Sequence, residues 1–301
     1  MRVLITGATG LIGKEIVELC LNEDITVHYL TTSKSKIKTE TNYKGFYWNP
    51  DKNEIDINCF DEVDTIINLV GASISKRWTD AYKAEVLKSR IQTTKLLAKA
   101  IETHNFPIKQ IVSASAIGIY PSSLTNYYEE DYSECSKSFL GDVVQQWETV
   151  IDTFHNLGIL VCKIRIGLVL AKHGGALPKI IKPIKYGLGA AFGSGKQWQS
   201  WIHVKDLARM FLFALTEDIE GTYNGVASNP VSNTELTKTA ARVLKRPLLL
   251  PNIPKFIMRL VLGEMHMLLF ESQRVSSAKI EGKGFQFKFS NIEPALRNLL
   301  K

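Results

Sequence analysis

The sequence predicts an α/β fold in which a doubly wound parallel sheet is followed by a smaller C-terminal α+β region. Three observations lead to this prediction. Apolar strand-like runs alternate with amphipathic helical patterns through the first two-thirds of the chain. Several of these runs are apolar almost throughout, as in strands buried on both faces of a parallel sheet. The first run leads directly into Gly7-x-x-Gly10-x-x-Gly13 and a helical pattern, which is the Rossmann-type order of strand, glycine turn and helix.

The N-terminal elements follow from these patterns in order. The apolar run from Val3 to Ile5 predicts a strand at 3–6, and Ile12, Ile16 and Cys20 recur at helical spacing and predict a helix at 11–21. The same criteria predict the remaining elements of the sheet region: strands at 26–31, 65–70, 110–114 and 161–165, and helices at 82–103, 142–155 and 207–216. Because strands and helices alternate, right-handed crossovers should connect the strands.

The regular alternation of strand and helix patterns ends after about residue 175. A Gly-rich stretch runs from 187 to 195, and the tail carries helical patterns at 234–244 and 257–270 around a Pro-rich link. Residues 282–289 alternate in polarity, which predicts a short strand, and a final amphipathic helix is expected at 292–300. We therefore expect a dinucleotide-binding domain at 1–233 and a small helical extension, packed at the substrate cleft, at 234–301.

Composition limits the classes of function. The chain has 301 residues, is 45% hydrophobic and 22% charged, and holds no apolar run near the length of about 20 residues that spans a bilayer. Its net charge of +7 comes from scattered lysines, so we expect an anionic cofactor or small-molecule substrate rather than nucleic acid or a membrane as partner. The four cysteines lack metal-ligand spacing, so we expect no metal site and reduced thiols, as in a cytoplasmic protein.

The glycine turn has a physical task at the first βα corner. Its glycines let backbone approach a pyrophosphate and let the helix pack closely on the strand, while the free N–H groups of the helix start attract phosphate. The expected cofactor contacts at this corner are Gly7, Thr9, Gly10, Leu11, Ile12 and Gly13. The alternative interpretation is a Gly-rich turn without a ligand.

The type of dinucleotide depends on the residues after the second strand. An acidic residue there would hold the ribose 2′-hydroxyl of NAD, but no Asp or Glu lies between Asp24 and Glu40. Hydroxyl groups and lysines take its place: Thr31, Thr32, Ser33, Lys34 and Lys36. A lysine neutralises a 2′-phosphate, so NADP(H) is preferred and NAD(H) stays possible. The lysines have a second interpretation, as part of a solvated loop.

Motifs along almost the whole chain carry a family resemblance. They include residues 7–13, Asn68-Leu-Val-Gly-Ala72, Lys76-Arg-Trp-Thr79, Ser113-Ala-Ser-Ala116, Trp147-Glu148, Ser200-Trp-Ile-His203, Arg246-Pro247 and Gly263-Glu-Met265. The chain resembles the extended short-chain dehydrogenase/reductase superfamily, and within it a branch of epimerase family proteins with a small C-terminal domain of unknown function. The resemblance implies that Gly71 and Ala72 lie beside the adenosine–pyrophosphate part of the cofactor, with Leu69 and Ser113 close by.

The superfamily normally uses a Ser, a Tyr and a Lys for catalysis, and this chain departs from that set. Ser115 fits the Ser, with Ser113 as the alternative, but none of the ten tyrosines has a Lys four residues later. Counting back from Trp147-Glu148 places Leu140 and Val144 at the Tyr and Lys positions. The candidate replacements are Tyr120 or the neighbouring Tyr127, Tyr128, Glu129 and Glu130 for the proton, and Arg90, Lys76 or Arg77 for the positive charge. Each of these also has a purely structural interpretation.

Candidate substrate contacts come from the second half of the chain. Arg77, Lys196, Trp201 and His203 are the residues chosen, with Gln197 and Trp198 beside them. His203 has an equally good structural interpretation, in which it caps the helix that follows. We expect an oxidoreductase or epimerase that transfers hydride at a polar hydroxyl or carbonyl substrate. The alternative is a non-catalytic NADP-binding sensor or scaffold, and either protein would be a monomer or homodimer.

Overall fold

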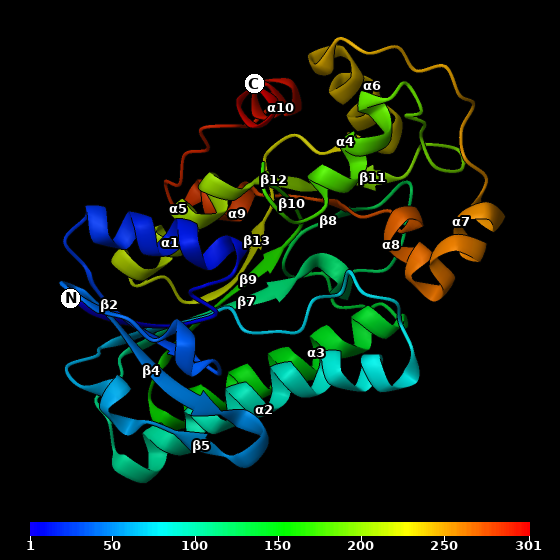
Figure 1. Ribbon diagram of the computed structural model, residues 1–301. Coiled ribbons are helices and arrows are strands. Elements are labelled where there is room, and N and C mark those ends of the chain that lie inside the picture. The colour runs from blue at the N-terminus through cyan, green and yellow to red at the C-terminus, as the bar shows by residue number, and fades with distance from the viewer.

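The centre of the molecule is a nine-stranded sheet, seen in a computed structural model that describes residues 1–301 (Figure 1). The strand order is β13-β9-β7-β6-β1-β2-β4-β3, with β5 paired to β4. The strands are β1 (Arg2–Thr6), β2 (Thr26–Thr31), β3 (Thr39–Glu40), β4 (Tyr43–Asn49), β5 (Glu54–Ile55), β6 (Thr65–Asn68), β7 (Gln110–Ala116), β9 (Leu160–Ile166) and β13 (Gly221–Gly225). All neighbours from β4 to β13 are parallel, and β3 and β5 pair antiparallel with β4.

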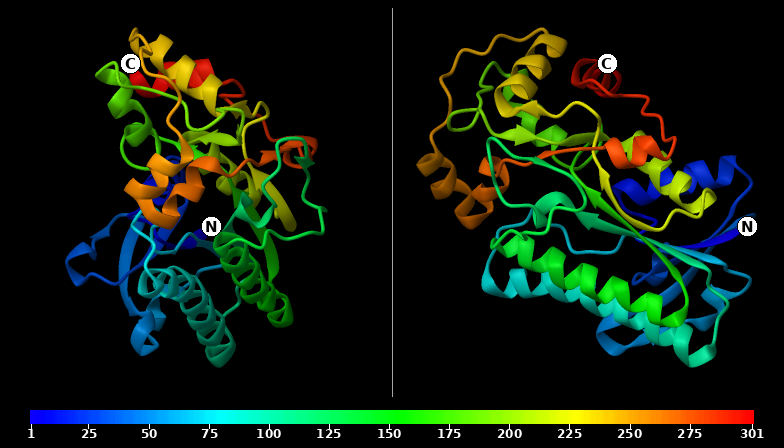
Figure 2. Two further views of the ribbon diagram at one scale, coloured as in Figure 1. Left: turned by 90° about the vertical axis from the view of Figure 1, so that its right-hand side faces the viewer. Right: turned by 180° about the vertical axis from the view of Figure 1, so that it is seen from behind.

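Helices cover both faces of this sheet. Figures 1 and 2 show α1 (Leu11–Asn22) and α5 (Val204–Thr216) together on one face, and α2 (Asp80–His104) and α3 (Phe139–Asp152) on the other. The largest core is a cluster of 43 buried residues from the strands and the facing sides of these helices. The arrangement confirms the predicted doubly wound sheet. The strand order reverses beside β1, and ligands of such sheets bind at the carboxyl ends of the strands at that reversal.

A smaller lobe adjoins the carboxyl ends of the strands. Its helices are α4 (Leu177–Lys185), α6 (Asn233–Leu244) and α10 (Ile292–Leu300). Short strand pairs join it to the sheet region: β10 (Leu168–Leu170) with β12 (Trp201–His203), β11 (Trp198–Gln199) with β14 (Val231–Ser232), and β8 (Tyr127–Tyr128) with β15 (Arg274–Val275). The lobe has its own core of 15 buried residues, among them Leu177, Trp201, Leu236 and Leu296. This core contains residues from before and after position 233. The division into domains at 1–233 and 234–301 stays a prediction.

Two predictions for the tail were wrong. The single helix expected at 257–270 is instead α7 (Lys255–Leu262), a short 3-10 turn at Gly263–His266 and α8 (Met267–Phe270). Gly263 has a φ of +59°, which ends the first helix. The strand expected at 282–289 is absent, because α9 (Ala278–Gly282) covers its start and the backbone N–H groups of Lys288 and Phe289 donate to the Asp206 carboxylate at 2.9 and 2.8 Å.

Four strands of the sheet were not predicted: the two-residue strands β3 and β5, and the longer strands β4 and β13. β4 holds Lys44 and Gly45 in its middle, which weakens its apolar pattern. Gly45 lies under the Tyr29 ring of the neighbouring strand, where an added Cβ would be 2.4 Å from Tyr29 Cζ. β13 begins and ends with glycine. In the whole chain no helix combines the length and the apolar character needed to cross a bilayer.

Candidate functional site

The first βα corner has the geometry that its glycines predict. Gly7 follows β1 with a φ of +75°, and its carbonyl accepts a hydrogen bond from the Gly10 N–H at 2.9 Å. A Cβ on Gly13 would lie 2.2 Å from the Gly7 carbonyl oxygen, so only glycine lets α1 pack this closely on the turn. Gly10 is the N-cap of α1, and no side chain caps the helix there. The N–H groups at the start of α1 are therefore available to an anion.

A cavity of about 660 Å³ opens beside this corner. Gly7 and Thr9 line it from the corner, and Thr31, Thr32 and Ser33 line it from the end of β2, as expected for the adenosine side of a dinucleotide site. Four charged residues also line this cavity: Lys36, Asp51, Glu85 and Lys88. Asp51 forms an ion pair with Lys88 at 2.8 Å, so its charge is partly balanced.

The two lysines after β2, Lys34 and Lys36, lie in different environments in the structure. Lys36 lines the cavity, whereas Lys34 does not. The Lys34 ammonium lies 5.1 Å from the centre of the Tyr47 ring and points at that aromatic face. The predicted cofactor contact at Lys34 is therefore replaced by Lys36 on the cavity wall.

Buried side-chain hydrogen bonds connect the carboxyl ends of the central strands β1, β6 and β7. Thr6 Oγ1 donates to Asn68 Oδ1 at 2.8 Å, and Asn68 Nδ2 donates to Ser113 Oγ at 3.1 Å. All three side chains are fully buried. Ser113, predicted as a cofactor contact and as the alternative catalytic Ser, therefore fixes neighbouring strands to each other and does not line either cavity.

A second cavity, of about 370 Å³, adjoins the first, and Val70 lines both. It lies where β6, β7 and β9 end, with α3 on one side and residues of the small lobe on the other. Five of the site residues that the sequence predicted line this cavity: Ile12, Leu69, Gly71, Arg90 and Ser115. Leu140 and Val144 of α3 also line it, so hydrocarbon lies in the same cavity as Ser115 at the two positions that the sequence analysis predicted for the Tyr and Lys of the superfamily.

Ser115 lines this cavity, but its hydroxyl proton is engaged elsewhere. Its Oγ donates to Glu148 Oε1 at 2.5 Å, and Arg165 holds the same carboxylate through Nε and Nη2, each at 2.9 Å. Burial opposes ionisation of Glu148, yet Arg165 and Ser115 lower its pKa below the ordinary value. Glu148 is thus an ionised acceptor. The predicted role of Ser115 as a donor to a substrate carbonyl is not met by this geometry.

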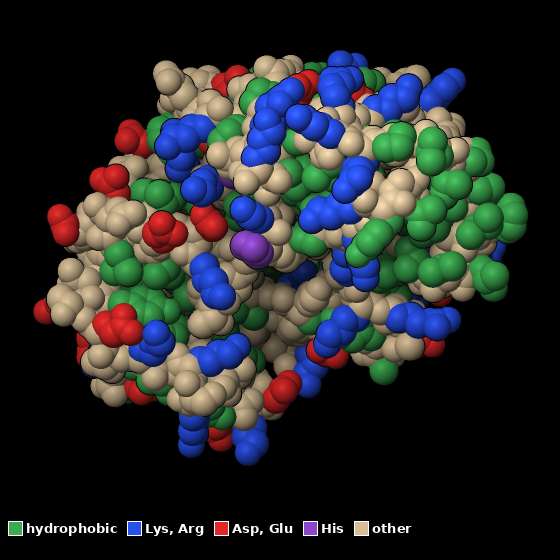
Figure 3. Space-filling model, turned by 45° about the horizontal axis from the view of Figure 1, so that its top comes forward, with side chains coloured by type: hydrophobic (Ala, Val, Ile, Leu, Met, Phe, Trp, Pro, Cys, Tyr) green, Lys and Arg blue, Asp and Glu red, His purple; other side chains and the backbone are tan.

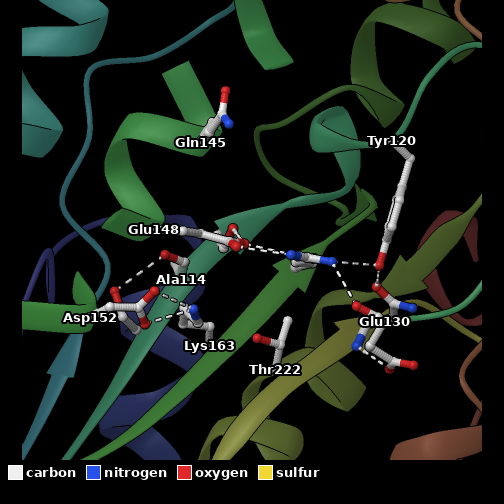
Figure 4. A network of polar contacts seen from close by, with 12 residues as sticks. Ala114, Tyr120, Glu130, Gln145, Glu148, Asp152, Lys163 and Thr222 are labelled. Atoms are coloured by element: carbon white, nitrogen blue, oxygen red, sulfur yellow. Dashed lines mark hydrogen bonds and ion pairs between the residues drawn. The ribbon is translucent and has the colours of Figure 1, made fainter. Parts of the chain in front are cut away.

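Tyr120, the predicted acid, lies deeper in the same network (Figure 4). Its hydroxyl donates to Asn224 Oδ1 at 2.8 Å and accepts from Arg165 Nη1 at 3.0 Å. The ring stacks on Tyr128 with centroids 5.1 Å apart and is 1% exposed. Burial raises the pKa of Tyr120, against the influence of Arg165. The structure does not bring Tyr120 to the cavity, so this network holds β7, α3, β9 and β13 together instead.

Arg90 is the cation of the second cavity. Its guanidinium lies 5.1 Å from the centre of the Trp147 ring, and Nη1 donates to the carbonyl oxygens of Val86 and Ala72 at 2.8 and 3.3 Å. No carboxylate lies within ion-pair distance, and Nε and Nη2 have no hydrogen-bond partner in the protein. Burial lowers the pKa of Arg90 to about 10, which still leaves the group charged at neutral pH. An unpaired guanidinium in an apolar cavity attracts an anionic or oxygen-rich ligand.

The small lobe contributes one residue that the sequence analysis named and five that it did not choose as site residues. Trp198, named beside the predicted substrate contacts, lines the second cavity, and so do Gln199, Ser200, Leu268, Glu271 and Gln273. Glu271 is its only carboxylate, and burial raises the pKa of that group above its ordinary value although Gln273 and Ser138 oppose the shift. No local motif marks Glu271, because tertiary packing brings it to Ser115 from a segment far along the chain.

The four predicted substrate residues lie outside the cavity. Arg77 and Lys196 are exposed, and neither lines it. Trp201 is fully buried in the core of the small lobe, where its indole Nε1 donates to the Asn229 carbonyl at 2.9 Å. His203 confirms its structural interpretation, because Nδ1 accepts from the Lys205 N–H at the start of α5 and the ring stacks on Phe289. Burial lowers the pKa of His203, so the imidazole is neutral there.

Two further predicted contacts flank the corner without lining a cavity. Leu11 packs against the glycine turn at Gly174 and Gly175, where added Cβ atoms would be 3.3 and 3.2 Å from its methyl carbons. The Ala72 N–H donates to Ser89 Oγ at 2.8 Å, and this bond fixes the segment after β6 to α2. An added Cβ on Gly71 would lie 2.7 Å from Arg90 Cζ, so the glycine leaves room for the guanidinium in its present position.

Comparison with known proteins gives two family models that match successive parts of the chain. The NAD-dependent epimerase/dehydratase family matches residues 3–225, and a domain of unknown function, DUF1731, matches residues 253–299. An epimerase family protein from Staphylococcus aureus is 37% identical over 300 residues, which cover 99% of each chain.

Solved structures resemble the chain over its full length. The crystal structure of the human epimerase family protein SDR39U1 with NADPH has a TM-score of 0.84 and 30% identity, and the match covers 99% of both chains. A nucleoside-diphosphate sugar epimerase from Corynebacterium glutamicum has a TM-score of 0.79 and 26% identity over 100% of this chain and 58% of its own.

Proposed function

The chain belongs to the NAD-dependent epimerase/dehydratase family, and from that premise we propose that it is an NADP(H)-dependent enzyme that transfers hydride at a hydroxyl or carbonyl carbon of a small polar molecule. The match confirms the family resemblance carried by the motifs. The observation that carries the proposal is that the two cavities adjoin, with Val70 in the wall of each. One begins at the glycine corner and the other ends at Ser115 and Arg90, with Val70 between them.

The residues present fit a nicotinamide dinucleotide. The unpaired N–H groups at the start of α1 suit a pyrophosphate, and a Cβ at Gly13 would close that corner. Lys36 is placed to neutralise a 2′-phosphate, which favours NADP(H) over NAD(H). The 30% identical human relative, whose structure is with NADPH, supports this choice. When bound, the nicotinamide ring donates or accepts a hydride.

The chain's own residues supply charge and a proton. In reduction, Arg90 stabilises the negative charge that develops on the substrate oxygen, and Glu271 gives that oxygen its proton. In oxidation, the Glu271 carboxylate takes the hydroxyl proton as hydride leaves the carbon. Ser115 stays bound to Glu148 and shapes the wall beside the reacting carbon. Glu271 and Arg90 thus replace the Tyr and Lys of the superfamily.

A second candidate function has a specific observation in its favour. Leu140 and Val144 stand where the superfamily has its Tyr and Lys, so the chain would hold NADP(H) as a sensor or scaffold without reacting it. The two candidates differ in turnover and agree in nucleotide binding.

Nicotinamide absorbance separates the two candidates. Purified protein is mixed with NADPH and a panel of aldehydes, ketones and keto-sugars, and with NADP⁺ and the matching alcohols. We expect turnover with at least one compound, lost in Glu271→Gln and reduced in Arg90→Gln but kept in Glu129→Gln, whose carboxylate is exposed. Tight NADPH binding without turnover anywhere in the panel would favour the sensor.

A further inference from the structure

Helix α7 presents an apolar face that nothing in the chain covers. None of its eight residues is buried, and the exposed fractions of Phe256, Leu260 and Val261 are 71%, 84% and 63%. The link before α7 adds Leu249 and Leu250, which are also exposed. Large hydrophobic side chains gathered in this way mark an interaction surface in most soluble proteins.

The exposed face extends to the end of α4. The link before α7 runs beside the segment after α4, since the Ile253 N–H donates to the Ala191 carbonyl at 2.8 Å and the Gly193 N–H donates to the Ile253 carbonyl at 2.9 Å. Exposed side chains of that neighbouring segment join the patch. We call the combined surface the α7 face, and its members are Tyr186, Leu188, Leu249, Leu250, Phe256, Ile257, Leu260 and Val261.

The α7 face is surrounded by positive charge. Residues 172–205 hold six lysines and no carboxylate, and residues 236–263 hold six further Lys and Arg and no carboxylate. These twelve charges exceed the +7 of the whole chain, so the remainder of the protein is net negative. Figure 3 shows Lys and Arg side chains bordering the hydrophobic side chains at the right of the view. Five exposed cations next to the face have no ion-pair partner: Lys182, Lys185, Arg246, Lys255 and Arg259.

This combination favours one kind of occupant. A second copy of the chain would bring like charges together, which opposes docking of two α7 faces. Nucleic acid would match the charge, and Tyr186 and Phe256 offer it stacking planes, but the other six members of the face are aliphatic and offer it neither stacking planes nor base-edge hydrogen bonds. An anionic bilayer matches both properties, because apolar tips enter the acyl boundary while lysine and arginine contact the headgroups.

We propose that the α7 face docks the protein on membranes that contain anionic lipids. The contact is peripheral, so it agrees with the absence of a spanning helix and revises the expectation, drawn from composition, of no membrane partner. α7 continues through Gly263–His266 into α8, whose Leu268 lines the second cavity. Docking therefore brings a segment that continues into the cavity wall close to the lipid surface.

Flotation with lipid vesicles tests the proposal without any nucleotide or substrate. We expect the wild-type chain to float with vesicles of phosphatidylglycerol and phosphatidylcholine in equal parts, to ignore pure phosphatidylcholine, and to dissociate as salt rises. The double variant Phe256→Gln/Leu260→Gln should partition at least about tenfold less. Lys255→Gln/Arg259→Gln should weaken binding to the anionic vesicles as well.

The matched control is Ile57→Gln, at an apolar residue that is 41% exposed in the 3-10 turn beside β2. It should float like wild type, and thermal melts confirm that every variant is folded. Wild-type protein that floats with neither vesicle overturns the proposal, as does a folded double variant that binds like wild type. Concentration-dependent dimerisation that the double variant abolishes, without vesicle binding, overturns it in favour of a second copy.

Discussion

Single side chains decide whether the second cavity can do chemistry. Arg90 supplies a charge without a carboxylate partner, and Glu271 supplies the one carboxyl group, while the hydroxyls of Ser115 and Tyr120 are committed to other protein groups. Burial holds the pKa of Glu271 above its ordinary value of 4.5. A carboxyl with a raised pKa keeps its proton to higher pH than an ordinary glutamate does, which suits it to giving a proton.

The raised pKa of Glu271 predicts a pH-dependent stability. Because the folded chain holds this proton more tightly than the unfolded chain, ionisation costs stability once pH rises above 4.5. Glu271→Gln removes that cost. We measure the melting temperature of Glu271→Gln minus that of wild type. This difference should increase as pH rises from about 4 to about 8. A difference that is constant with pH would show that Glu271 ionises normally.

The position of Lys36 predicts the nucleotide preference. Loss of a charge-assisted contact of about 1.5–3 kcal/mol should weaken NADPH binding in Lys36→Gln by about tenfold or more and leave NADH binding nearly unchanged. Lys34→Gln is the control, because Lys34 lies over Tyr47 and not on the cavity wall. Equal losses for both nucleotides, or a larger loss in the control, would contradict this assignment of the 2′-phosphate site.

Among the elements, the corner between β1 and α1 has the tightest steric requirement. An alanine Cβ at Gly13 would meet the Gly7 carbonyl oxygen at 2.2 Å and Ala8 Cα at 2.7 Å, which are backbone atoms that cannot rotate away. Gly13→Ala should therefore cost about 1–3 kcal/mol in the free energy of unfolding and weaken NADPH binding. Gly282→Ala is the control, since its Cβ meets nothing within 4 Å. Denaturant titration and calorimetry measure both effects.

Local pattern was sufficient for the elements that build the sheet and the corner. The apolar runs at β1, β2, β6, β7 and β9 and the glycine turn are properties of short segments, so the sequence displayed them directly. β4 and β13 were not predicted because lysine or glycine interrupts their apolar pattern, and only their pairing in the sheet stabilises them as strands.

Site residues were harder to predict because chemistry-bearing side chains also serve packing. Trp201 and His203 have suitable functional groups, yet both are fully buried in the small lobe. Glu271 reaches the cavity only through the packing of that lobe. Residue type and spacing therefore located the nucleotide corner but did not identify the groups opposite Ser115.

As a whole molecule the chain has two large hydrophobic cores, and both depend on segments that are distant in the sequence. Leu236 of α6 and Leu296 of α10 complete the small-lobe core with Leu177 and Trp201, and Phe285 belongs to the main core. We expect the full chain to melt in one cooperative transition and the fragment 1–233 to show none, because it lacks half of one core. A cooperative melt of the isolated fragment would instead make 1–233 an independent domain.

Calorimetric titration of the full chain with NADPH and with NADH tests the central claim, which is that the β1–α1 corner binds a phosphorylated nicotinamide dinucleotide. We predict binding of NADPH at one site, with a Kd at least about tenfold lower than that for NADH. Folded protein that takes up neither nucleotide at millimolar concentration would contradict the claim.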